Sequence, residues 1–152
     1  LHNFEVDAEI EHCLNKIATE FLSVKDEHSL YSIIKLYKAL PSEQKQLIEP
    51  VIYESIEGIV TLTKEKWEEY SPQPYKLITR DMAIFSKYEK SYVENIKFIQ
   101  ESVTSDGVWY PEWQWYQFND VFNETAKFQW MGYITYERLK LLIEESKIKQ
   151  KD

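Results

Sequence analysis

The chain has little of the residue types that build disulfide-bonded or loop-rich folds. Among its 152 residues are one cysteine, three glycines and five prolines. A single cysteine cannot form a disulfide within the chain, and so few glycines and prolines leave few tight turns. Because 43% of the residues are hydrophobic and 15% aromatic, the composition predicts a folded, mostly helical protein. We expect one helical domain over 1–146 and a frayed, charged tail over 147–152.

The chain also lacks an excess of positive charge and long apolar runs. Its formal net charge is −8, whereas nucleic acids and anionic membranes attract clustered lysine and arginine. No run approaches the roughly 20 apolar residues of a membrane span, and the N-terminus lacks the order of a signal peptide. We therefore expect a cytoplasmic protein that binds neither nucleic acid nor a membrane. Because the chain begins at Leu1 rather than Met, we also expect it to be the C-terminal part of a longer protein.

Residues that could hold a metal or act as nucleophiles are scattered. His2, His12 and His28 show no metal-ligand spacing, and the neighbours His12 and Cys13 face different directions on a helix. Cys13 falls on an apolar helix face, which favours a buried, inert thiol. Nucleophile elbows and glycine-rich phosphate loops are missing. The sequence predicts no metal and no cofactor.

Apolar residues recur at helical spacing along most of the chain. The pattern predicts helices over 7–23, 27–40 and 42–62, a fourth helix ending near Val103, and a last helix starting at Asn119 or Asp120. The prolines between Thr63 and Phe85 predict a long irregular connector. We expect five principal helices and an all-α fold of stacked helix hairpins. On the last helix, the predicted buried residues are Trp130, Ile134, Leu139 and Leu142.

Aromatic residues concentrate between Asp106 and Leu142, which hold four of the five tryptophans. Carboxylates flank them at Asp106, Glu112, Asp120 and Glu124. Paired carboxylates serve carbohydrate chemistry, and flat rings make platforms for sugars or apolar ligands. The candidate ligand-binding residues are Asp106, Trp109, Glu112, Trp113, Trp115 and Tyr116. The structural alternative is that Asp106 is a turn residue, Glu112 is solvated and the tryptophans are core residues.

Two further expectations concern packing near the C-terminus. Trp109 and Trp130 should be buried and close to each other. Gly132 lies inside a predicted helix, where glycine is unfavourable, so a neighbouring ring or backbone should approach it closely.

Gln100, Gly107 and Trp109 resemble the Gln...Gly-x-Trp motif of the terpenoid-cyclase and protein-prenyltransferase superfamily. The pairing of Trp130, Gly132, Thr135, Leu139 and Leu142 is similar to the closing helix of uncharacterised bacterial members, and the connector with Trp67, Tyr70 and Pro74 also looks like theirs. The resemblance covers roughly 25–143. It implies a partial α/α toroid in which the Gln ties a helix end to the next loop and the Trp packs across to the next helix. The Gln-to-Gly spacer is longer here than in that family, and the aromatic residue expected before Gln100 is missing.

The catalytic motifs of that superfamily do not carry over. The sequence has no Asp-x-Asp-Asp run, no Asp-Asp-x-x-Asp run and no Asp, Cys and His set for zinc. Two function classes stay open. The first is a noncatalytic helical module whose aromatic surface binds a peptide, a glycan or a partner subunit. The second is an α/α-barrel enzyme, a glycosidase or lyase, whose other catalytic residues lie upstream.

Loss of a preceding hairpin would leave an apolar helix face without a partner. Such a face becomes an interface in most soluble proteins. The first helix is the candidate, through Ile10, Leu14, Ile17 and Phe21. Its partner would be the missing N-terminal half or a second copy in a twofold dimer.

Overall fold

The computed structural model describes residues 7–21 and 23–148, and all regular structure within these ranges is helical. The all-α prediction is confirmed. The principal helices are α1 (Asp7–Glu20), α2 (Glu27–Ala39), α3 (Ser42–Ile59), α5 (Phe85–Glu101) and α7 (Lys127–Ile148). The first four end one to three residues before their predicted ends.

Shorter helical segments fill the stretches between the principal helices. The predicted irregular connector contains the 3-10 helix η1 (Lys64–Glu68) and the single turn α4 (Pro74–Leu77). The predicted last helix begins with α6 (Asn119–Val121) after the 3-10 turn η2 (Tyr116–Phe118), and it passes through the π-helical segment η3 (Phe122–Ala126) into α7. A π segment inserts one extra residue, so the helical face shifts there.

The chain divides into two compact units. The first contains the described residues up to 61 together with 72–86, and the second contains 62–71 together with 87–148. One domain over 1–146 stays a prediction. Of the predicted tail, residues 147 and 148 end α7, and 149–152 lie outside the described residues.

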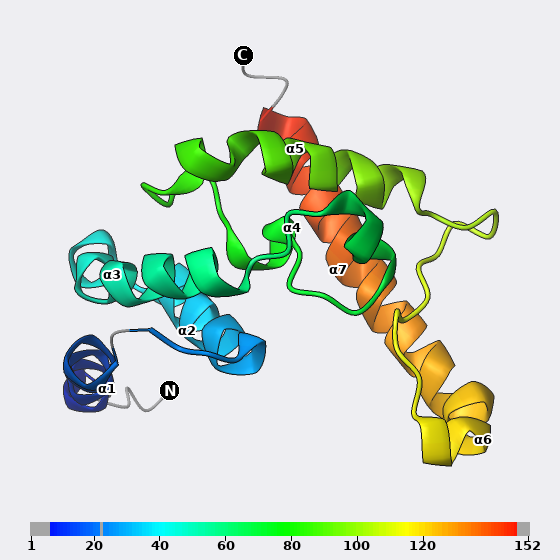
Figure 1. Cartoon of the computed structure of the whole chain (residues 1–152), viewed down its shortest axis with the longest axis horizontal. Coiled ribbons are helices and arrows are strands. Elements are labelled where there is room, and N and C mark those ends of the chain that lie inside the picture. The colour runs from blue at the N-terminus through cyan, green and yellow to red at the C-terminus, as the bar shows by residue number, and fades with distance from the viewer. Residues whose placement is uncertain (1–6, 22, 149–152) are drawn as a thin grey trace, which may run out of the picture. The chain divides into compact units, whose positions relative to one another are not determined.

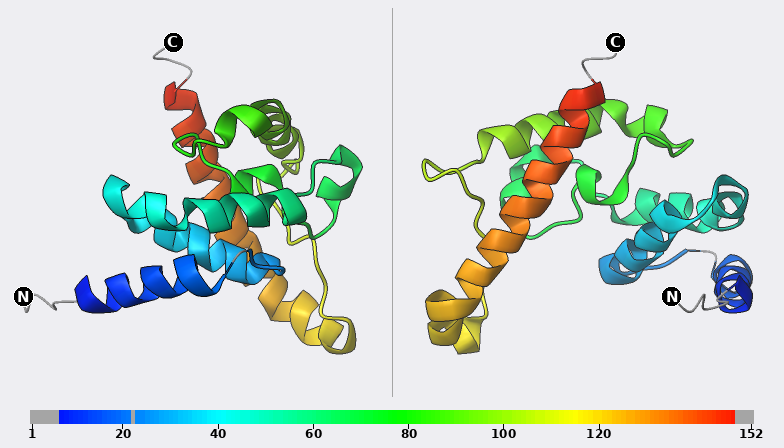
Figure 2. Two further views of the ribbon diagram at one scale, coloured as in Figure 1. Left: turned by 60° about the vertical axis from the view of Figure 1, so that its left-hand side comes forward. Right: turned by 180° about the vertical axis from the view of Figure 1, so that it is seen from behind.

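In the first unit, α1 and α2 pack on α3, and α4 packs on α2 (Figures 1 and 2). Leu14 supplies the buried contact of α1, whereas its neighbour Cys13 is exposed. The prediction of a buried thiol is wrong, because adjacent helical residues point about 100° apart. The core residues of this unit are Leu14, Leu30, Ile34, Tyr37, Ile48, Ile52 and Ile56.

The second unit is built from η1, α5, α7 and the loop over 102–115, which we call the aromatic loop (Figure 1). Trp67 of η1 is fully buried, with its ring 5.6 Å from that of Phe98 on α5. The other core residues are Tyr88, Tyr92, Ile96, Ile99, Trp109, Phe122 and Ala126.

The buried side of α7 differs from the prediction. Trp130 and Leu139 are 39% and 46% exposed, whereas Arg138 and Glu145 are buried. Each buried charge has a partner: Arg138 pairs with Glu112, and Glu145 accepts a hydrogen bond of 2.9 Å from the Tyr92 hydroxyl. Apolar periodicity failed here because paired charges can take positions that the pattern reserves for hydrophobic residues.

Asp26 generates a pH prediction. Its carboxylate accepts the Ser29 backbone N–H at 2.8 Å and so caps α2, and this hydrogen bond lowers the pKa of Asp26 below 3.8. A lowered carboxyl pKa stabilises the folded state above the unfolded value, and the stabilisation is lost as pH falls through the folded value. We expect Asp26→Ala to lower Tm at neutral pH, with the difference from the parent narrowing in acid.

Asp26→Asn is the matched control, because it keeps the capping oxygen but has no carboxyl to titrate. Its Tm should stay near the parent's at neutral pH. Thermal melts followed by circular dichroism at several pH values check this. A difference between Asp26→Ala and the parent that stays constant through the acidic range would contradict the assignment.

Candidate ligand-binding site

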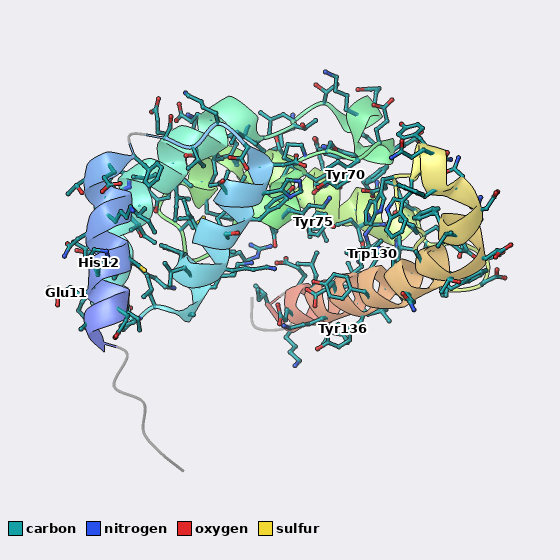
Figure 3. The ribbon with its side chains drawn as sticks, turned by 90° about the horizontal axis from the view of Figure 1, so that it is seen from below. Glu11, His12, Tyr70, Tyr75, Trp130 and Tyr136 are labelled. Carbon is teal, nitrogen blue, oxygen red and sulfur yellow. The ribbon has the colours of Figure 1, made fainter. Side chains whose placement is uncertain are left out.

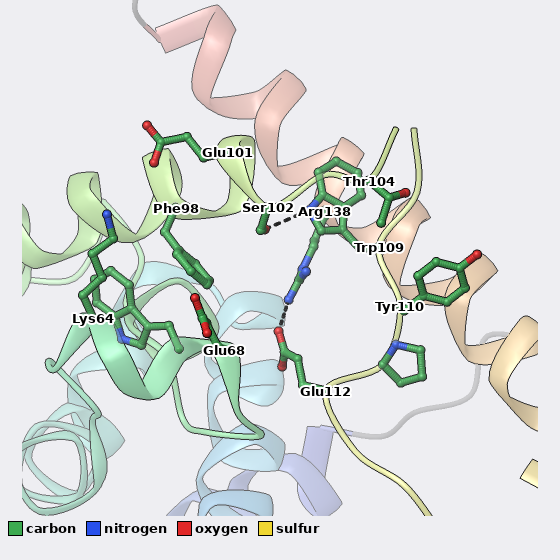
Figure 4. Close-up of a pocket in the computed structure, with 12 residues that line it drawn as sticks. Lys64, Glu68, Phe98, Glu101, Ser102, Thr104, Trp109, Tyr110, Glu112 and Arg138 are labelled. Carbon is green, nitrogen blue, oxygen red and sulfur yellow. Dashed lines mark hydrogen bonds and ion pairs between the residues drawn. The ribbon is translucent and has the colours of Figure 1, made fainter. Parts of the chain in front are cut away.

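The second unit contains an open pocket of about 570 Å³ (Figure 4). Its walls come from η1, the C-terminal half of α5, the loop that follows α5, and α7. The lining residues are Lys64, Trp67, Glu68, Phe98, Glu101, Ser102, Thr104, Trp109, Tyr110, Pro111, Glu112 and Arg138.

A tight turn after α5 aims the aromatic loop toward this pocket. Gly107 donates its N–H to the Thr104 carbonyl at 2.9 Å and has φ of +77°, a left-handed conformation that favours glycine. The Thr104 hydroxyl donates to the Val108 carbonyl at 2.9 Å. Asp106 sits exposed in the turn and does not line the pocket.

Trp109 joins the end of α5 to α7. Its indole N–H donates to the Ile99 carbonyl at 3.0 Å and to the Ser102 hydroxyl oxygen at 3.2 Å. Its backbone N–H donates to the Thr135 hydroxyl oxygen on α7 at 3.1 Å. Because the ring is also buried, Trp109 holds the pocket wall in place and offers little surface to a ligand.

Arg138 and Glu112 form a buried ion pair at the pocket (Figure 4). Arg138 is 4% exposed, and its guanidinium carbon lies 6.0 Å from the centroid of the Trp109 ring. Its Nε has no hydrogen-bond partner among the described residues. The pair fixes the loop to α7 and removes both charges from the set available to a ligand.

The remaining carboxylates of the pocket differ in their partners. Glu101 lies 3.6 Å from the ammonium nitrogen of Lys97. Glu68 forms no hydrogen bond or ion pair with another residue in the part of the chain described. Figure 4 shows the carboxylates of Glu68 and Glu112 both pointing into the pocket. Glu68 is therefore the lining carboxylate most available to a ligand.

Most of the aromatic loop packs outside the pocket. Trp113 packs edge-to-face between Tyr70 and Trp130, with ring centroids 5.6 and 5.3 Å apart. The ring centroids of Trp130 and Tyr133 lie 5.9 Å apart. Trp115 contacts Phe122 at 5.6 Å. These edge-to-face contacts, and the tilted contact of Trp115 with Phe122, let the rings pack on one another without a ligand.

Of the six predicted site residues, the structure brings Trp109 and Glu112 into the pocket. Asp106, Trp113, Trp115 and Tyr116 lie outside it, and Tyr116 is 85% exposed. The sequence analysis missed five lining residues that matter here: Lys64, Glu68, Phe98, Glu101 and Arg138. Trp67 in the connector was the sequence feature that could have pointed to Glu68, because a buried ring fixes the position of the next residue.

Among the described residues, no group of three or more His, Cys, Asp or Glu residues could hold a metal ion. Within the same ranges, every helix is too short or too polar to traverse a bilayer.

The chain was compared with protein-family models, curated proteins and solved structures. None of these matches it.

The ion pair gives a stability prediction. Arg138 is buried and Glu112 is partly buried, so Glu112→Leu leaves a buried charge uncompensated and should cost about 3–5 kcal/mol of unfolding free energy, whereas Arg138→Met should cost less. The double variant should recover much of the loss, since two apolar side chains replace two compensated charges. Urea denaturation of the three variants measures the coupling. If the loss of unfolding free energy in the double variant equals the sum of the losses in the two single variants, the two charges are not coupled.

The two tryptophans that the sequence predicts to be buried should differ in how much their replacement by alanine lowers the unfolding free energy. Trp109→Ala removes a buried ring with two hydrogen bonds from its indole N–H and should cost about 3–5 kcal/mol. Trp130→Ala should cost clearly less, because Trp130 is half-exposed. Equal destabilisation in urea would contradict the placement of these rings.

Proposed function

We propose that this chain is a noncatalytic helical binding module whose second unit holds a basic side chain of a peptide segment. The observation that supports it is Glu68, a carboxylate directed into the pocket without a partner among the described residues. Carboxylates recognise lysine and arginine through charge-assisted hydrogen bonds.

The charge of the pocket lining favours a cation over an anion. Three glutamates, one lysine and one arginine line the pocket, which gives the lining a formal charge of −1, although Glu101 is also paired with Lys97 outside the lining. Arg138 is neutralised by Glu112, so it does not attract an anionic ligand. The formal charge of −8 for the whole chain would also attract basic partners over a distance.

Aromatic rings in the pocket wall suit the apolar stem and the charged end of a basic side chain, and Phe98 is the one that lies next to Glu68 (Figure 4). Phe98 and Tyr110 line the pocket and are partly exposed. The ring of Tyr110 already has the ammonium nitrogen of Lys127 at 5.0 Å from its centroid. A cation over the face of an exposed ring is stabilised by about 0.5–1 kcal/mol.

We also propose that the helix hairpins stack as in a partial α/α toroid, as the resemblance to the terpenoid-cyclase superfamily implies. The contact of Trp109 with both α5 and α7 supports it, since that Trp is expected to pack across to the next helix. Gln100 is exposed, and the indole of Trp109 makes the tie to the helix end.

An enzyme of the glycosidase or lyase type is the second candidate. It is favoured by one observation, that Glu68, Glu101 and Glu112 line a single pocket. Two carboxylates on opposite sides of a sugar are the usual requirement of glycoside hydrolysis. The ion pair of Glu112 with Arg138 counts against it, because Glu112 is then held as part of the scaffold.

A peptide array tests the proposed ligand. We expect arginine- and lysine-containing peptides to bind in preference to acidic counterparts of the same length. Glu68→Gln should weaken binding of the selected peptide about tenfold or more, the effect of losing one charged contact. Glu65→Gln is the matched control, since Glu65 is an exposed glutamate of η1 that does not line the pocket.

The same array should carry glycans, and both sets should be examined for cleavage. Equal weakening by Glu68→Gln and Glu65→Gln would show that binding depends on overall charge and not on the pocket. Binding of glycans alone, or their hydrolysis, would contradict the proposal and favour the enzyme.

A further inference from the structure

The outward side of α7 carries an apolar surface of its own. We define the outer stripe as Phe128, Gly132, Tyr136, Leu139 and Ile143. Its four side chains are between 46% and 61% exposed. Figure 3 shows Tyr136 on the outer side of α7 and Trp130 on the side toward Tyr70. The stripe is therefore about half-exposed, and it lies on the longest of the described helices.

Gly132 lies within this surface. We expected a neighbour to approach it closely, but apart from its chain neighbours and the backbone of its own helix, no described atom lies within 4 Å of a Cβ built there. That expectation is wrong within the chain itself. Glycine weakens a helix interior relative to alanine, so an exposed helical glycine with open space around it leaves room for something outside the chain.

The five positions form one continuous stripe. At about 100° per residue they fall within an arc of about 80°, and at 1.5 Å per residue they extend over about 22 Å. This is the spacing by which one helix packs along another.

Four of the five stripe positions form two pairs that are symmetric about the centre of the stripe, whereas Tyr136 is mirrored by Thr135, which is not a stripe residue. Phe128 and Ile143 mark its ends, and Gly132 and Leu139 each lie four residues inside an end. A twofold axis makes residue i of one copy contact residue j of the other, and j contact i. An antiparallel pair of α7 helices would thus place Phe128 beside Ile143 of a second copy. Gly132 would leave room for Leu139 of that copy.

Charges at the two ends of the stripe fit the same arrangement. Glu124 and Lys147 are exposed and equally distant from its centre. Antiparallel pairing brings them to the same height with opposite signs, whereas parallel pairing brings like charges together. The helix dipoles also oppose each other favourably in an antiparallel pair.

We propose that the outer stripe of α7 binds a second copy of this chain as a twofold, antiparallel helix pair. The first helix is a poorer candidate than its sequence indicates, because Leu14 is already buried in the first unit. Aromatic side chains bury about 150–250 Å² each when fully covered, so the half-exposed Phe128 and Tyr136 offer on the order of 200 Å². Standard interfaces bury roughly 800 Å² per partner. Because the available area is well below this, we expect the dimer to be weak.

Sedimentation velocity over a micromolar concentration series tests the surface. Leu139→Gln should weaken dimerisation about tenfold or more. Val93→Gln is the matched control, because Val93 lies on α5 and is 46% exposed, as Leu139 is. Gly132→Gln should weaken the dimer as well, whereas Gly58→Gln should not, although Gly58 is also a helical glycine with open space around it.

Disulfide cross-linking tests the antiparallel register. In a Cys13→Ser background, a mixture of the Phe128→Cys and Ile143→Cys chains should form a cross-linked dimer on mild oxidation, and each chain alone should not. Because a disulfide requires Cα atoms about 4.4–6.8 Å apart, a cross-link forms only between positions that face each other in the dimer.

Three results would overturn the proposal. One is a monomer throughout the concentration series. Another is equal weakening by Leu139→Gln and Val93→Gln, which would place the interface elsewhere. The last is efficient cross-linking of Phe128→Cys or Ile143→Cys with itself, which would show a parallel pair.

Discussion

The second unit depends on the way that Trp109 is held. Its indole N–H binds the end of α5, and its backbone N–H binds the Thr135 hydroxyl on α7. Two helices that are distant in sequence are thereby fixed through one residue of a loop. A buried indole without an acceptor would be unfavourable, so these bonds and the burial of the ring require each other. The pocket exists because this loop cannot move away from the helices.

Arg138 and Glu112 complete the same construction and limit what the pocket can do. Their pairing brings two charges into a buried position, which is tolerable only when each compensates the other. It also removes Glu112 from the carboxylates that a ligand could use. Glu68 is left as the acidic group facing the pocket, and the proposal of a basic ligand depends on that difference. The outer stripe of α7 is a separate surface, whose centre lies about 120° around the helix from Arg138 at 100° per residue.

The principal helices could be predicted from the sequence because apolar periodicity and proline positions are local signals. The turn at Gly107 was also visible, since glycine is favoured where φ is positive. The buried face of α7 could not be predicted in this way. Arg138 and Glu145 resemble solvent-exposed residues until their partners Glu112 and Tyr92 are known, and those partners are distant in sequence. Glu68 was missed for the same reason, because the connector meets α5 only in the folded unit.

The most direct measurement is the hydrogen exchange of the indole N–H groups, followed by nuclear magnetic resonance. If Trp109 holds α5 to the loop, its indole proton should exchange slowly, with protection close to that of the fully buried Trp67. The indole protons of Trp115 and Trp130 should exchange quickly, because both rings are partly exposed. Exchange at Trp109 as fast as at Trp115 would contradict the account, since the pocket would then lack its anchor.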